Sequence, residues 1–203
     1  MRNFLAPFIA VCCVFQVNAQ QIRYDAASIP AKLREKAHVV KRFENITFEV
    51  KDVDRAVYTV HRVLTVLDEL GESELNFVEY TNKLRKIDEF EIKGYNAEGV
   101  QTDRFRKKDL NKQAGLDGLV SDYMIHYMKI GSTRFPVTIE YKYEVEFTGT
   151  ANYPSYQVQD SEESVEYSAF TAKVPADLDL RYREQRINLK PVVSSARLTF
   201  MPG

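Results

Sequence analysis

The sequence predicts an all-β protein, mainly antiparallel, folded as a β-sandwich of roughly nine to eleven strands with one short N-terminal helix. One observation is the strict apolar–polar alternation of residues 137–147, which is typical of a strand with one dry and one wet face. A second is that similar segments recur about every 8–15 residues. The third is that no crossover helices stand between these segments, as a parallel sheet would need.

The strand predicted over residues 137–147 is the clearest element. Its even positions include Glu140, Glu144 and Glu146. Glycosidase chemistry needs two carboxylates across a cleft, whereas these three glutamates follow one strand. We therefore expect all three on a solvated face. The dry face carries the odd positions, namely Val137, Ile139, Tyr141, Tyr143, Val145 and Phe147.

Residues 1–19 are predicted to be a secretory signal peptide, with cleavage after Ala19, and residues 20–203 a single domain. Arg2 precedes an apolar run of about 14 residues, which is short of the roughly 20 that span a bilayer. Two alternatives remain open: a membrane anchor, and a lipoprotein in which Cys12 follows a weak lipobox. On the main reading the mature chain has no membrane span and lies in the periplasm or at the cell surface.

Both cysteines of the chain, Cys12 and Cys13, fall within the predicted signal peptide. The mature chain is then expected to lack a disulfide, a thiolate metal site and a cysteine nucleophile. The formal net charge is −1, which argues against nucleic acid as a partner.

The remaining elements follow in chain order. A short helix over 28–37 would begin at Ser28 as N-cap. Residues 68–73 are expected to form a loop in which Gly71 is able to take a positive φ. The segment 56–67 is apolar on both faces, which indicates a central strand covered twice over part of its length. Residues 104–118 are expected to form a loop or one helical turn. Further strands are predicted over 46–50, 75–80, 87–95, 100–105, 122–130, 164–173, 178–184 and 197–201.

No constellation of catalytic or metal-binding residues stands out, so we expect no cofactor, no metal and no catalytic residue. His38, His61 and His126 lack zinc-ligand spacing, and we expect His61 to be a hydrogen-bonded core or edge residue. The pairs Asp52/Asp54 and Asp177/Asp179 are read as turn residues because they lack the other ligands of a calcium loop.

Two surface features have competing interpretations. A basic cluster around Phe105 is read as charge guarding an edge strand rather than as an anion site; it consists of Arg104, Arg106, Lys107 and Lys108. Tyr153 and Tyr156, in the irregular segment 149–160, are candidate ligand-binding aromatics for glycan or a partner surface. They could equally close one end of the sandwich.

Several segments together resemble a known family. They are 24–30, 39–44, 48–50, 63–67 with Gly71, 137–145, 165–167 and 173–182. The chain resembles the bacterial domain of unknown function 3857 over nearly all of its mature length. The resemblance implies a β-sandwich at the N-terminus of larger exported proteins of Gram-negative bacteria, usually followed by a transglutaminase-like core with a Cys–His–Asp triad. The triad positions have no counterpart here, which implies a stand-alone domain or a shortened part of a longer protein.

Two functions follow as hypotheses. The first is a non-catalytic exported scaffold or binding module, not an enzyme, whose partner is a transglutaminase-like core or another exported protein. The second is a cell-surface domain that binds carbohydrate or protein through loop aromatics such as Tyr153 and Tyr156.

Overall fold

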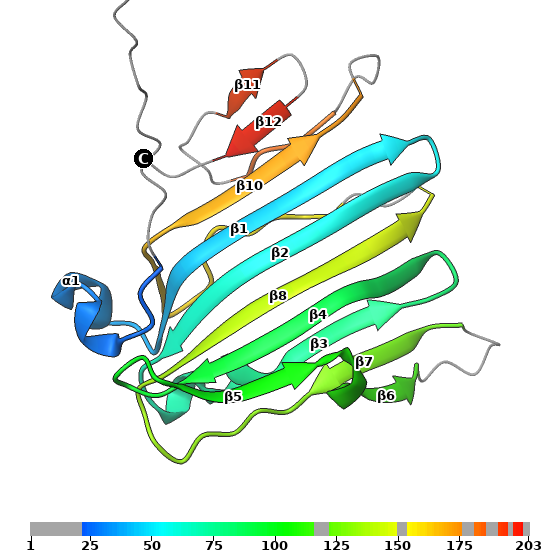
Figure 1. Cartoon of the computed structure of the whole chain (residues 1–203). Helices are drawn as coiled ribbons and strands as arrows, with labels where there is room; N and C mark the ends of the chain where they lie inside the picture. Colours follow the sequence, from blue (N-terminus) through cyan, green and yellow to red (C-terminus); the bar gives the residue numbers. More distant parts are fainter. Residues whose placement is uncertain are drawn as a thin grey trace, which may run out of the picture.

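The protein is a two-layered β-sandwich in a computed structural model, which describes residues 22–115, 122–149, 154–175, 181–185, 191–194 and 197–200. A nine-stranded sheet forms one layer and a three-stranded sheet forms the other. Figure 1 shows the large sheet as a broad twisted surface with the small sheet behind its lower part. The all-β, mainly antiparallel sandwich predicted from the sequence is confirmed.

The large sheet has the order β11-β12-β10-β1-β2-β8-β4-β5, with β9 paired to β1, and the small sheet has the order β3-β7-β6. The strands of the large sheet are β1 (Val39–Asp52), β2 (Arg55–Val66), β4 (Arg85–Tyr95), β5 (Gln101–Arg106), β8 (Val137–Thr148), β9 (Glu163–Val165), β10 (Ser168–Lys173), β11 (Val192–Ser194) and β12 (Arg197–Phe200). Those of the small sheet are β3 (Phe77–Thr81), β6 (Asn111–Ala114) and β7 (Met124–Met128). The short helices are η1 (Ala26–Ser28), α1 (Ala31–Arg34), η2 (Glu69–Leu75) and η3 (Lys107–Asp109).

Strand β2 lies between β1 and β8 and pairs with both along its whole length. The central position predicted for 56–67 is therefore confirmed. The segment 164–173, predicted as one strand, is divided into β9 and β10, which both run parallel to β1. Their break lies beside the bulge of β1 between Lys41 and Phe43, where the pairing register shifts.

The main core lies between the two sheets and confirms the dry face predicted for β8. Ile139, Tyr141 and Val145 are all buried, and Phe77 of the small sheet joins the same cluster. Alternate positions of β8 therefore point into the space between the layers, as the period of a strand requires.

The opposite face of the large sheet, called here the open face, is covered at one end by the N-terminal segment. Ile29 of this segment packs with Val40 of β1. The structure has two short helices, η1 and the four-residue α1, in place of the single helix predicted over 28–37. Ser28 does not cap it; the side chain of Asp25 accepts a hydrogen bond from the Ser28 N–H instead.

Other expectations need correction. Gly71 lies in η2 and does not take a positive φ; it is needed because a Cβ there would lie 2.7 Å from Val39 Cγ2. The polar segment 104–118 contains β6 as well as the single turn η3. Of the strand predicted over 178–184, residues 178–180 lie outside the described residues, and 181–184 form no strand.

Candidate functional site

The most unusual side chain on the open face is Glu140 of β8. Its exposed fraction is 2%, so the expectation that it lies on a solvated face is wrong. Glu144 is half-buried and Glu146 is exposed, as expected of a strand that is covered at one end only. Glu140 is buried because the N-terminal segment lies over its end of the open face.

Four donors surround the Glu140 carboxylate. The Tyr24 and Tyr95 hydroxyls each donate to it at 2.9 Å. His61 Nε2 lies at 2.7 Å and Lys142 Nζ at 2.9 Å. A carboxylate only accepts hydrogen bonds, so Nε2 of His61 carries the proton in this contact.

The electrostatics of this group, called here the Glu140 cluster, follow from those contacts. Burial alone would raise the pKa of the Glu140 carboxyl, but the hydrogen bonds from His61, Lys142 and the two tyrosines outweigh it. They hold the pKa of Glu140 far below its ordinary value. Burial and the neighbouring Glu140 charge raise the pKa of Tyr24 to about 12, so both partners keep the protonation state that the hydrogen bond needs.

The cluster contains a carboxylate and an imidazole, which are two parts of a hydrolytic triad. A triad also needs a nucleophile hydrogen-bonded to the imidazole. Within the described part of the chain, His61 hydrogen-bonds to Glu140 and to no hydroxyl. The expectation that His61 is a hydrogen-bonded residue is confirmed. The arrangement anchors the N-terminal segment, since Tyr24 also stacks on Tyr95 with ring centroids 4.1 Å apart.

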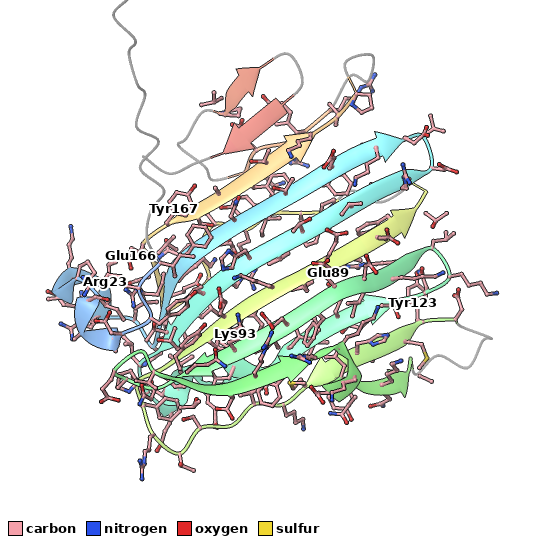
Figure 2. All side chains as sticks on the ribbon, in the orientation of Figure 1. Arg23, Glu89, Lys93, Tyr123, Glu166 and Tyr167 are labelled. Carbon is pink, nitrogen blue, oxygen red and sulfur yellow. The ribbon has the colours of Figure 1, made fainter. Side chains whose placement is uncertain are left out.

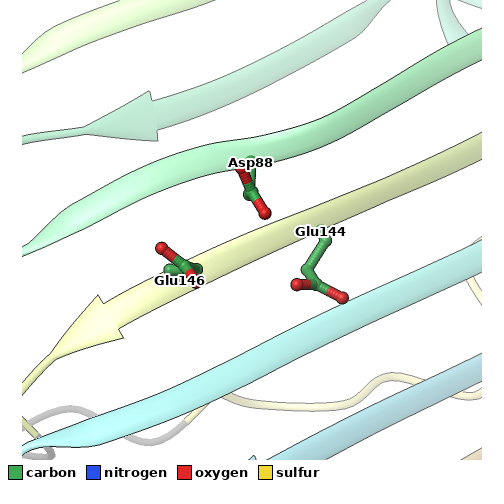
Figure 3. Close-up of side chains that lie close together, drawn as sticks. All are labelled: Asp88, Glu144 and Glu146. Atoms are coloured by element: carbon green, nitrogen blue, oxygen red, sulfur yellow. The ribbon is translucent and has the colours of Figure 1, made fainter.

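Three carboxylates gather further along the open face. A bulge of β4 between Ile87 and Phe90 brings Asp88 beside Glu144 and Glu146 of β8, with oxygens within 4.8 Å of one another. Figure 3 shows the three side chains together. Asp88 and Glu146 are exposed, and exposed carboxylates often cluster without a metal, so this cluster by itself defines no metal site.

Tyr156, one of the two predicted ligand-binding tyrosines, is half-buried. Its ring stacks on Phe170 with centroids 5.2 Å apart. Its hydroxyl lies 2.5 Å from Ser168 Oγ, and Ser168 donates to the fully buried Glu44 at 2.6 Å. Tyr153 lies outside the described residues. Ligand binding by these two tyrosines stays a prediction.

The Glu44 carboxylate belongs to a charged network on the covered face of the large sheet. Arg62 Nε donates to it at 2.6 Å. Lys41 Nζ lies 3.6 Å from it and 3.1 Å from a carboxylate oxygen of Glu163. Burial alone would lower the pKa of Arg62, but the effect of the adjacent Glu44 charge is larger. The pKa of Arg62 is therefore raised above its ordinary value. Two carboxylates and two cations thus balance within the layer, and the network joins β1 to the segment that carries Tyr156.

The other residues noted in the sequence lie apart from these clusters. His38 pairs with Asp68 at 2.9 Å, and His126 Nε2 lies 2.9 Å from the Thr81 hydroxyl. Of the basic cluster, Arg104 and Arg106 lie on β5, an edge strand of the large sheet as predicted, and Lys107 and Lys108 lie in η3, which follows it. Cys12, Cys13, the predicted signal peptide, and the Asp177/Asp179 pair lie outside the described residues.

The outer face of the small sheet is apolar on β3 and β7, although nothing in the described residues covers it, whereas β6 adds the polar Asn111 and Gln113. Val78 and Tyr80 of β3 are 53% and 52% exposed, and their cross-strand partners on β7 are Tyr127 and Ile125. Tyr123, at the start of the same region, is also exposed (Figure 2). Contiguous exposed apolar side chains of this kind often mark interaction surfaces.

These features define a class of protein: a β-sandwich domain whose buried charged groups are paired internally and whose smaller sheet exposes apolar side chains on β3 and β7. The chain belongs to the family described as "Domain of Unknown Function with solved-structure structure (DUF3857)", whose model matches residues 52–199. No curated protein matches the chain in sequence.

A solved structure shares the fold. It is a putative protease from Parabacteroides distasonis, with a TM-score of 0.66 and 10% sequence identity. The match covers 81% of this chain and 35% of the other, so this chain spans about a third of that protein. None of the helices in the described residues has the length and hydropathy of a transmembrane span.

Sequence reasoning missed the Glu140 cluster. Tyr24 and Tyr95 reach Glu140 from 116 and 45 positions away in the chain, and no local pattern encodes such a contact. The sequence does carry a signal at Gly94, which interrupts an otherwise regular strand. A glycine in a strand often marks a close approach of backbone or ligand.

Proposed function

We propose that this domain is a non-catalytic accessory module of an exported protein assembly, which binds a larger partner rather than transforming a substrate. The observation that carries the proposal is the coverage of the fold match: the same fold forms about a third of a longer putative protease. A domain that forms one part of a longer protein can support the rest of that protein. We propose a supporting role of this kind for the present chain.

The partner that we propose is a transglutaminase-like cysteine-peptidase core, or another exported protein. The apolar outer face of the small sheet supports this choice, because Val78 and Tyr80 would be desolvated by a docked domain. The Glu140 cluster supports a structural role for the imidazole–carboxylate pair, since its geometry anchors the N-terminal segment. For location, we propose export to the periplasm or cell surface, with a mature chain that begins at Gln20.

The test is a binding measurement between the purified chain 20–203 and a separately produced transglutaminase-like core from the same genome. We expect a one-to-one complex, and we expect the double variant Val78→Ser/Tyr80→Ser to weaken it at least about tenfold. The matched control is Val192→Ser, which changes an exposed valine of β11 on the other sheet. Failure of every such core to bind, or equal weakening by the control, would refute the proposed partner.

Export has its own measurement. N-terminal sequencing of the protein recovered from the periplasm or cell surface should begin at Gln20. Recovery of the chain in the cytoplasm with Met1 retained would contradict the proposed location.

A further inference from the structure

A cleft of ≈ 840 Å³ opens at one end of the sandwich. The β4–β5 hairpin forms one side of it, and the segment 130–137, which leads from β7 into β8, forms the other. Figure 1 shows this segment passing below β5 before it enters β8. The cleft lies between these two parts of the fold, and all the residues that line it belong to the described part of the chain.

Gly94 of β4 shapes one edge of the cleft. In the register of the sheet, Gly94 pairs with Ile139 on one side and Asp103 on the other. A side chain here would stand in the same row as the buried Ile139. A Cβ at Gly94 would lie 3.2 Å from the Asp103 carboxylate, which is tighter than an ordinary contact. The glycine therefore lets the side chains of Asp103 and Thr102 lie close over β4 at the edge of the cleft.

The cleft combines an apolar floor with a polar rim. Leu75 and Ile139 of the main core lie at its base, and Phe105, Ile130 and Phe135 are half-buried along its walls. Its volume lies within the range of small-ligand sites, and its lining combines apolar walls with many polar side chains.

The rim carries two carboxylates, Asp103 and Glu98, that form no ion pair within the described part of the chain. Asp103 accepts a hydrogen bond from the Thr102 hydroxyl at 2.7 Å. Within the described residues, neither Asp103 nor Glu98 has a basic nitrogen within 4.0 Å, whereas Glu140 and Glu44 both do. Arg134 is the basic residue of the lining, so the rim has one more negative charge than positive.

We infer that this cleft binds a ligand in which an apolar group adjoins a protonated amine. The apolar group would contact Phe105, Ile130 and Phe135, and the ammonium would donate to the Asp103 carboxylate. A free hydrophobic amine and the apolar N-terminal residue of a peptide share this chemistry. The inference goes beyond the accessory role proposed above and does not depend on it, because neither Val78 nor Tyr80 lines the cleft.

The test is a titration of the ¹⁵N-labelled chain 20–203, followed by amide chemical shifts. The probes are phenethylamine, the peptide Phe-Gly-Gly, and N-acetyl-Phe-Gly-Gly, which lacks the charged amine. We expect saturable shifts at Gly94, Asp103 and Val137 with at least one of the first two probes and weaker binding of the acetylated peptide. Saturation by phenethylamine alone assigns a free amine, and tighter binding of the peptide assigns a peptide N-terminus.

Two variants and a control complete the test. Asp103→Asn keeps the shape of the exposed side chain and should lower affinity about tenfold, because it removes a charge-assisted hydrogen bond. Gly94→Val should abolish binding, because the valine side chain would displace the Asp103 carboxylate that it would crowd. Asp88→Asn makes the same chemical change on the open face and should bind like the wild type. Absence of saturable shifts with both amines, equal binding of the acetylated peptide, or wild-type affinity in Asp103→Asn would each overturn the inference.

Discussion

Replacing Glu140 with glutamine should destabilise the protein more than any other single charge-removing change on the open face. The carboxylate receives four donors at 2.7–2.9 Å. A hydrogen bond to a charged group contributes about 1.5–3 kcal/mol. The glutamine carbonyl can still accept two of the four bonds, while its amide group faces the remaining donors. Removing one partner of a buried ion pair typically costs about 3–5 kcal/mol, and we expect a loss near 3 kcal/mol.

The assay is urea unfolding followed by far-UV circular dichroism, because the chain has no tryptophan. For a domain of this size, a loss of about 3 kcal/mol lowers the melting temperature by roughly 6–12 °C. The matched control is Glu146→Gln on the same face of β8, where the side chain is exposed and the cost should stay within about 0.5 kcal/mol. Equal free energies of unfolding for the two variants would refute this account of Glu140.

The pH dependence gives the same prediction a second readout. The folded-state pKa of Glu140 lies below its ordinary value of 4.5, so its contribution to stability is present above pH 4.5 and is lost as the pH falls. The difference in stability between the wild type and Glu140→Gln should therefore be constant near neutral pH and should shrink below pH 4.5. A difference that grows on acidification would contradict the assignment.

Two further predictions concern other parts of the fold. Gly71→Ala should cost about 2 kcal/mol in urea unfolding, because its Cβ would lie 2.7 Å from Val39 Cγ2 and 2.8 Å from the His38 carbonyl oxygen. Gly131→Ala, whose Cβ would meet only a Glu72 oxygen at 3.5 Å, is the control, and equal costs would show that crowding at Gly71 is misjudged. His38 should titrate in NMR above its ordinary pKa of 6.5, because the hydrogen bond from its ring to Asp68 favours the charged form; the stability of this pair is present below pH 6.5 and is lost as the pH rises through the raised pKa. Asp68→Asn should bring that pKa down, and an unchanged titration would exclude the pairing.

Local patterns in the sequence were enough to predict most strands of the large sheet. The alternation around Ile139 and Tyr141 reports burial against a second layer, and it depends only on neighbours two positions apart. Both strands of the hairpin between β4 and β5 were predicted, over 87–95 and 100–105, and Gly99 takes a φ of 80° in the turn between them. Short edge elements such as β6 were missed, since their residues are all exposed and carry no apolar period.

The same rule failed at Glu140, and the reason is physical. Alternation assigns a residue to one side of the sheet, but it does not say what covers that side. Here the N-terminal segment brings Tyr24 over one end of the open face, so one glutamate of β8 is buried while Glu146 stays in water. Gly71 shows a related limit: its lack of a side chain is required by packing against Val39, and only the folded structure reveals that contact.

The most direct measurement of the central claim is a hydrolysis assay on the purified chain 20–203 with fluorogenic peptide and isopeptide substrates. Because His61 hydrogen-bonds to Glu140 and to no hydroxyl among the described residues, the account predicts no product above the buffer rate, for the wild type and for His61→Gln alike. Turnover by the wild type that His61→Gln abolishes would show that the cluster is an active site, and would contradict the non-catalytic role proposed for this domain.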